Sequence, residues 1–389
     1  MSDAPIPLTK PVLEEREAEA ARRAILSGWV TQGPEVLAFE KEFAAFVGAP
    51  HACAVSSCTT ALHLALLALE IKPGDEVITV SHTYIATANS IRYCGATPVF
   101  VEIDPATYNL DVTKIESALT PKTRAILCVH QMGMPCDLRA LLPLAKKNGL
   151  PVVEDCACAI GSQIKWENDW EQIGKPHGDI ACFSFHPRKV ITTGDGGMIT
   201  TTRVDWDQKF RLLRQHGMSV PDSIRHTAKQ VIYEEYPLLG YNYRMTDIQA
   251  AIGREQLKRL PEIVTRRRHL AERYLRHLAS LPDVILPLEP AWARSNWQSF
   301  CVRLPETCDQ RQVMQKMLDA GVMTRRGIMS CHREKPYVER HGGKSLPLSE
   351  SASDHTVILP IYPQMTEAEQ DRVISVFTQA IGRSRNNPS

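Results

Sequence analysis

The sequence predicts an α/β protein in which a doubly wound, mostly parallel sheet is followed by a smaller α+β domain. Between about residue 50 and residue 200, short apolar runs alternate with amphipathic stretches of helical length, as βαβ units require. The apolar runs are continuous, which is typical of parallel strands covered on both faces. Beyond residue 255 this alternation ends, and 389 residues are enough for two domains. We therefore expect a large domain at 1–255 and a small one at 256–389.

Two helices are expected first, a charged one at 11–26 and a second at 39–47, because a turn rich in Gly, Gln and Pro separates them. The alternating part begins after them, and Ser57 or Thr59 would cap its first helix. In chain order its elements are strand 52–56, helix 59–70, strand 76–80, helix 85–95, strand 97–103, helix 111–119, strand 123–131, helix 137–149, strand 151–155, strand 180–185 and strand 196–202.

A long helical pattern begins near Thr246 and continues into the 270s, and it leads into the small domain. There the order of helices and strands no longer fits repeated βαβ units, so a mixed α+β arrangement is expected. The expected elements are strand 298–304, helix 307–321, strand 322–328 and helix 367–381.

Composition limits the classes of function. Charged residues make up 23% of the chain and the formal net charge is +1, which favours neither nucleic acid nor a membrane as partner. The N-terminus lacks the apolar core of a signal peptide and no apolar run could span a bilayer, so a cytoplasmic location is expected. The eleven cysteines lie mostly in apolar runs, as reduced thiols do. Cys156 and Cys158 lack the second ligand pair of a zinc site, so no metal is expected.

Lys189 is the first candidate for chemistry. It lies in SFHPRKVITTGDGG (184–197), directly after an expected strand and before a glycine-rich turn. Ligands collect at such strand ends in open α/β sheets. A lysine there, partly desolvated so that its pKa falls, can form Schiff bases. By itself this pattern also fits an exposed surface lysine.

The expected strand 151–155 brings Glu154 and Asp155 to the same edge of the sheet. A carboxylate there can pair with the protonated ring nitrogen of pyridoxal phosphate and keep the ring cationic, so that it acts as an electron sink. A helix N-cap is the alternative for Asp155, because a helix-like segment follows it.

Two further segments complete the set. VSSCTTALHLAL (55–66) takes a strand through a hydroxyl-rich turn into a helix, whose free N–H groups and dipole favour a phosphate. In HTYIATAN (82–89), Tyr84 follows a strand and can stack on a flat ring. A capped helix and a packing tyrosine are the plain alternatives. The order of phosphate turn, aromatic, strand-end Asp and strand-end Lys is more specific than any one segment.

This set resembles the fold-type I pyridoxal-phosphate enzymes, and more narrowly the DegT/DnrJ/EryC1/StrS family of sugar aminotransferases. The similarity covers nearly the whole chain. Its most specific pieces are FSFHPRKVITTGDGG, GDEVITVSHTYIATANSI and GYNYRMTDIQAAIG.

The resemblance implies a role for each matching position. Lys189 would form the internal aldimine with pyridoxal phosphate, Asp155 would bind the ring nitrogen and Tyr84 would stack on the ring. Family members build each site at a dimer interface, so a homodimer with shared active sites is expected. The phosphate ligands would be Thr59, Thr60, Ser184 and, from a second subunit, Asn242.

One position departs from the family pattern. Three residues after the ring-binding Asp the family usually has Gln or His, which contacts the ring oxygen of the cofactor, whereas this chain has Cys158. A thiol is a weak hydrogen-bond partner, so the tuning of the ring is expected to differ. Cys58 also stands where Gly is common in the phosphate turn.

The implied reaction is the ping-pong transfer of an amino group from glutamate or glutamine to a keto sugar linked to a nucleotide, with Lys189 as general base and acid. Substrate-side residues are less clearly marked. In MTRRGIMSCHREKPY (323–337), basic side chains can bind a diphosphate or sugar hydroxyls, or form a solvated basic face. The substrate-side candidates are Gln32, Gly33, His186, Arg325, Arg326 and His332.

Two other functions stay open. The acceptor can be a ketocyclitol or another non-nucleotide ketone. The protein can also be a pyridoxamine-phosphate-dependent sugar dehydratase, a lyase on the same scaffold. Those lyases replace the lysine with histidine or recruit an iron–sulfur cluster, whereas here Lys189 is intact and no cysteine trio has cluster spacing.

Overall fold

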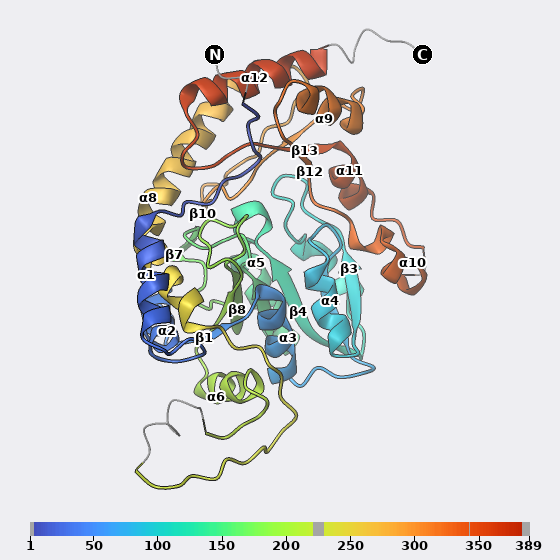
Figure 1. Ribbon diagram of the computed structural model, residues 1–389. Coiled ribbons are helices and arrows are strands. Elements are labelled where there is room, and N and C mark those ends of the chain that lie inside the picture. Colours follow the sequence, from blue (N-terminus) through green and yellow to red (C-terminus); the bar gives the residue numbers. More distant parts are fainter. Residues whose placement is uncertain (1–3, 221–228, 342, 383–389) are drawn as a thin grey trace.

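A seven-stranded sheet forms the centre of the computed structural model, which describes residues 4–220, 229–341 and 343–382 (Figure 1). In spatial order the strands are β1 (His51–Val55), β9 (Gly197–Thr201), β8 (Ile180–Ser184), β5 (Val152–Asp155), β4 (Thr123–Val129), β2 (Glu76–Val80) and β3 (Thr97–Val101). The pairs from β8 through to β3 are parallel, and β9 is antiparallel to both of its neighbours. The expected mostly parallel α/β sheet is confirmed.

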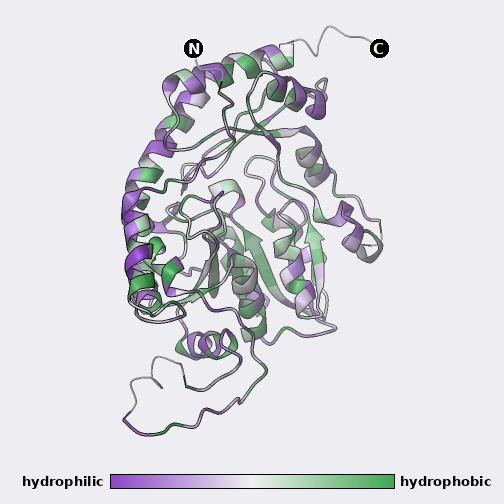
Figure 2. Ribbon diagram, viewed as in Figure 1, coloured by the Kyte–Doolittle hydropathy of each residue, from purple (hydrophilic) through white to green (hydrophobic). Residues whose placement is uncertain are grey.

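Helices pack on this sheet because their apolar faces and the strands are buried together. Figure 2 shows the central strands as the most hydrophobic part of the molecule, with hydrophilic residues on the outer faces of the helices. The rings of Phe43 and Phe183 lie 5.0 Å apart and join a helix to the sheet. The helices of this part are α1 (Glu15–Leu26), α2 (Pro34–Val47), α3 (Cys58–Ala68), α4 (Ala86–Tyr93), α5 (Leu138–Lys147) and α6 (Val204–Leu213).

Helix α8 (Asp247–Leu278) connects the large sheet with a second, smaller core (Figure 1). Thr246 caps it, in a reciprocal arrangement with Gln249. The expected boundary at 255/256 lies inside this helix, which gives Leu257 to the large core and Leu270 to the small one. Near the other end of the chain, Ile6 packs in the small core as well.

The small core contains a three-stranded antiparallel sheet in the order β11 (Phe300–Arg303), β13 (Thr356–Leu359) and β12 (Arg325–Arg326). Its helices are α9 (Gln310–Asp319), α10 (Lys335–His341), α11 (Pro347–His355) and α12 (Glu367–Gly382). A third sheet joins β10 (Ala293–Arg294), β6 (Gln163–Trp166) and β7 (Asp169–Gln172).

Two expected elements are wrong in kind or length. The helix at 111–119 is instead two 3-10 turns, Val112–Lys114 and Glu116–Ala118, because the Asp111 carboxylate accepts the N–H of Thr113 and closes a local turn. The strand at 322–328 shrinks to Arg325–Arg326, since it is an edge strand that pairs only with β13. Of the helices in the described residues, none is long and apolar enough to cross a membrane.

Candidate active site

A cavity of about 410 Å³ opens where the carboxyl ends of β5 and β8 face the small sheet. Segments of the large sheet and of the small sheet both line it, because the turns after the parallel strands meet Arg325–Met329 and Ile358 there. Nine of the predicted cofactor and substrate contacts lie on its wall: Thr59, Tyr84, Asp155, Cys158, Ser184, His186, Lys189, Arg325 and Arg326.

Lys189 lies in the turn after β8, and its Nζ donates a hydrogen bond to Sγ of Cys158 at 3.1 Å. Burial acts to lower the pKa of the Lys189 amine. The Cys158 sulfur and the Asp155 carboxylate outweigh burial, so the pKa lies above its ordinary value. The expected fall of this pKa is therefore wrong for the structure described here, because the Cys158 sulfur and the Asp155 carboxylate stabilise the ammonium.

Asp155 ends β5 and is 5% exposed. Its Oδ1 accepts the N–H of Ala157 at 3.1 Å, and its Oδ2 accepts the hydroxyl of Thr87 at 2.9 Å. Burial raises the pKa of this carboxyl, although Ala157, Thr87 and Lys189 oppose the rise. A buried carboxylate whose charge is only partly compensated is suited to receive a cation.

Glu154 does not share this position, although the sequence placed both carboxylates at one edge. Successive side chains of a strand point to opposite faces. Glu154 accordingly contacts His130 Nε2 at 3.1 Å and accepts the N–H of Gly178 at 2.7 Å, on the far side of β5.

The turn before α3 borders the cavity and leads into a helix N-terminus, where an anion is favoured. Ser57 caps the helix and accepts the N–H of Thr60 at 3.2 Å, so Thr60 is engaged in the cap while Thr59 lines the cavity. Gly197 of β9 lies directly against this turn, where an added Cβ would meet Ser57 and Cys58 backbone atoms at 2.5–2.8 Å. The glycine therefore lets the strand approach the helix N-terminus closely.

The remaining predicted residues lie outside the cavity. His332 is buried, and its Nδ1 lies 2.6 Å from the Ser81 hydroxyl. Gln32 and Gly33 precede α2, where the Gly33 N–H donates to Asp247 at 2.8 Å. Asn242 is exposed on the chain after residue 240 and forms an isolated bridge with Gln215.

Several lining residues were not foreseen. Thr87 contacts Asp155 and, through a 2.9 Å hydroxyl pair, Thr83. Thr87 lies in the first turn of α4 whereas Thr83 precedes the helix, so helical spacing alone does not report that they meet. Polar side chains from distant segments, which only folding brings here, also line the cavity: Gln131, Gln298 and Ser299.

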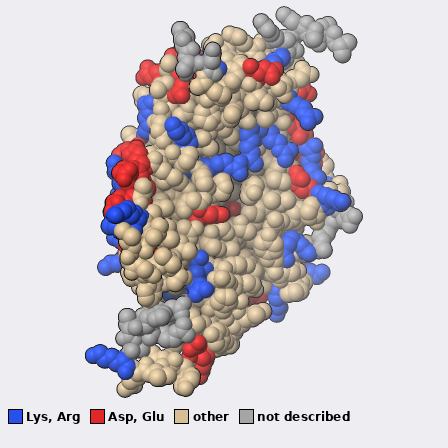
Figure 3. Space-filling model, viewed as in Figure 1, with Lys and Arg blue, Asp and Glu red and all other residues tan. Residues whose placement is uncertain are grey.

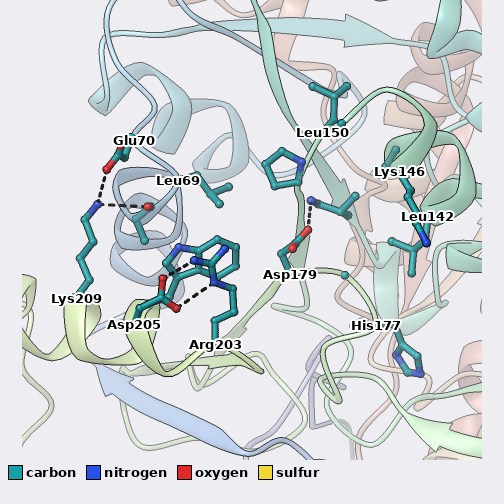
Figure 4. A pocket seen from close by; sticks show the side chains of 17 residues that line it. Leu69, Glu70, Leu142, Lys146, Leu150, His177, Asp179, Arg203, Asp205 and Lys209 are labelled. Carbon is teal, nitrogen blue, oxygen red and sulfur yellow. Dashed lines mark hydrogen bonds and ion pairs between the residues drawn. The ribbon is translucent and has the colours of Figure 1, made fainter.

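A larger cavity of about 860 Å³ lies at the opposite, amino-terminal edge of β5 (Figure 4). Two ion pairs lie on its wall, Lys209 with Glu70 at 3.5 Å and Arg203 with Asp205, and Asp179 accepts the N–H of Val152. Because these pairs are already satisfied, this cavity lacks the reactive arrangement seen around Lys189.

Lys189 and the buried Asp155 line one cavity at the carboxyl edge of a parallel sheet, beside the N-terminus of α3. This is the arrangement expected of an enzyme active site. The chain belongs to the DegT/DnrJ/EryC1/StrS aminotransferase family, whose model matches residues 11–378. It is therefore an enzyme of the aminotransferase type.

Solved structures agree with this assignment over nearly the whole chain. The aminotransferase TlmJ from Streptoalloteichus hindustanus is 32% identical, with 97% of this chain and 99% of that one covered and a TM-score of 0.89. DesV from S. venezuelae, solved with a ketimine intermediate, is 33% identical, with 99% and 100% covered and a TM-score of 0.88. Spr1654 from Streptococcus pneumoniae, described as a sugar aminotransferase and solved in its PLP form, is 26% identical, with 98% and 99% covered and a TM-score of 0.89.

Proposed function

We propose that this protein is a pyridoxal-phosphate-dependent sugar aminotransferase that takes its amino group from glutamate or glutamine. The observation that carries the proposal is that Lys189 and Asp155 line the same cavity. The donor set fits the cofactor: an amine for its aldehyde, a buried carboxylate for its ring nitrogen, and a helix N-terminus for its phosphate. The cofactor contacts we propose are Thr59, Thr60, Tyr84, Asp155, Cys158, Ser184, Lys189 and Asn242.

When bound, pyridoxal phosphate supplies an electron sink for negative charge at the donor's α-carbon. Asp155 would hold the ring nitrogen in its protonated form, and that cation would offset the burial of the carboxylate. Lys189 would hold the cofactor's aldehyde through Nζ, and its free amine would carry a proton to and from the donor's α-carbon. Cys158 contacts Lys189 directly and so acts on the protonation of its amine.

The acceptor we propose is a keto sugar linked to a nucleotide. Arg188, Arg325 and Arg326 line the cavity, and within the described residues no carboxylate pairs with Arg188 or Arg325. Burial lowers the pKa of Arg325, and repulsion from the other two arginines lowers it further. An anionic group such as a diphosphate would relieve this repulsion. His186 lines the same cavity and is a candidate for the sugar.

We also propose a homodimer with shared sites. The segment from residue 229 to 240 extends away from the body of the molecule beyond α6 (Figure 1). Its apolar side chains Val231, Tyr233 and Leu239 are 83%, 89% and 85% exposed. Exposed apolar groups of this kind mark protein interfaces. Two domains at 1–255 and 256–389 and a cytoplasmic location complete the proposal.

The absorption spectrum of the purified protein with pyridoxal phosphate tests the function. A visible imine band is expected that disappears when glutamate or glutamine is added and is absent in Lys189→Ala. A wild type without the band would overturn the role of Lys189. A band that does not change when either donor is added would overturn the transaminase assignment, although it would still support binding of the cofactor.

A further inference from the structure

The contact between Cys158 and Lys189 joins two nucleophiles at the wall of the active-site cavity. The Sγ and Nζ atoms are 3.1 Å apart and come from different segments, the turn after β5 and the turn after β8. All eleven cysteines are free, and Cys158 is the one that is not buried. A small reagent that enters the cavity therefore meets this thiol and this amine side by side.

Charge favours the contact. Burial acts to lower the pKa of the Lys189 amine, but the Cys158 sulfur is the foremost of the groups that raise it. Cys158 is half-buried at the cavity wall, so a peroxide that enters the cavity can reach its sulfur. The Lys189 side chain also has a flexible four-carbon stem, so its nitrogen can approach the sulfur further.

We propose that Cys158 and Lys189 form a reversible sulfur–nitrogen cross-link when the protein meets a peroxide while the Lys189 amine is free. The cross-link itself needs only the observed pair. That the amine alternates between free and cofactor-bound during turnover rests on the proposed function.

The reaction balances in two steps. In the first, the Cys158 sulfur takes one oxygen from hydrogen peroxide, which gives a sulfenic acid and one water. In the second, Lys189 loses its extra proton to water and, as the neutral amine, attacks that sulfur; the S–O bond breaks, and the hydroxide leaves as water with a further proton from nitrogen. In sum, thiol, amine and peroxide give the S–N bond and two waters. Two equivalents of an external thiol reverse it, returning thiol and amine and leaving a disulfide.

The cross-link would change function because it occupies the nitrogen that the cofactor needs. It would also protect Cys158 from irreversible oxidation, since a sulfenic acid that condenses does not proceed to the sulfinic acid. Enzyme whose Lys189 is bound to the cofactor should not form the cross-link, because the Lys189 nitrogen is already bonded.

The test treats the full-length protein with hydrogen peroxide, with no added cofactor, with pyridoxal phosphate alone, and with pyridoxal phosphate plus glutamate. The intact mass should fall by two hydrogen atoms in the first and third samples. In the second sample a much smaller fraction of the protein should show this loss. Tryptic mapping should join the peptides of Cys158 and Lys189, with no cleavage after Lys189. Dithiothreitol should restore the original mass.

Cys158→Ser and Lys189→Arg should both abolish the adduct. Cys58→Ser should still form the adduct. This control is needed because Cys58 lines the same cavity, and a disulfide between Cys58 and Cys158 would also remove two hydrogen atoms. Sulfinic acid at Cys158 with an unmodified Lys189, or a disulfide in place of the joined peptides, would overturn the proposal. The sample without cofactor separates this result from the proposed function, because a free Lys189 amine should cross-link there even if the spectroscopic test fails.

Discussion

The hydroxyl of Thr87 donates a 2.9 Å hydrogen bond to Oδ2 of Asp155, and the Thr83 hydroxyl lies 2.9 Å from the Thr87 hydroxyl. Both threonines are about 1% exposed. The carboxylate therefore reaches the cavity already oriented by the first turn of α4. Thr87 acts through Asp155 and is a positioning residue for the proposed ring contact.

Thr87→Val should lower kcat roughly 10- to 100-fold, because a hydrogen bond to a charged group contributes about 1.5–3 kcal/mol. The pKa of Asp155, already raised by burial, should rise further, so the acid limb of the pH–rate profile should move to higher pH. Thr87→Ser keeps the hydroxyl and should behave like the wild type. Equal losses in both variants, with no shift of the profile, would argue for a packing effect.

Arg325→Ala should weaken binding of a nucleotide-linked acceptor. Loss of one charge-assisted hydrogen bond predicts a KM higher by roughly 10-fold or more. The half-reaction with glutamate, followed by the imine band, should keep its rate if Arg325 contacts only the acceptor. Arg139→Ala, which removes an exposed arginine paired with Asp137, is the control. An unchanged KM for nucleotide-linked acceptors would favour a non-nucleotide ketone.

Glu40→Gln should destabilise the fold by about 3–5 kcal/mol, since it leaves the buried Arg214 without its counter-charge. Burial acts to raise the pKa of Glu40, but Arg214 and Arg211 outweigh it and lower the pKa below 4.5. This contribution to stability is therefore complete above the ordinary carboxyl pKa and is lost as pH falls through the lowered one. Urea unfolding at several pH values should show that acid-dependent loss in the wild type and less of it in the variant.

Glu116→Gln removes a carboxylate from an exposed pair with Lys147 and should change stability little. If Glu116→Gln lowered the free energy of unfolding as much as Glu40→Gln does, burial would not explain the cost of losing the Glu40 charge.

Asn242→Ala tests the shared site. Loss of a phosphate contact should weaken cofactor binding roughly 10- to 100-fold, measured by titration of the imine band. Mixing this variant with Lys189→Ala should restore activity, because each heterodimer then has one site with Lys189 from one chain and Asn242 from the other. No recovery in heterodimers confirmed by mass would show that each site belongs to one chain.

The sequence alone was enough to predict the sheet, because the continuous apolar runs of β4 and β8 and the helical periodicity between strands are local patterns. Lys189 and Asp155 could be placed at one edge for the same reason, since parallel strands end together. The short turns at 112–118 were missed because Asp111 binds the local backbone, an effect that periodicity does not report.

What only the tertiary structure decided are the contacts between distant segments. Strand alternation turned Glu154 away from Asp155, and packing of α4 brought Thr87 to that carboxylate, 68 residues away in the chain. The 3.1 Å approach of Lys189 to Cys158 likewise depends on the adjacency of β5 and β8, which no local pattern contains. Local sequence determines which elements form, whereas side-chain direction and neighbouring strands determine which groups meet.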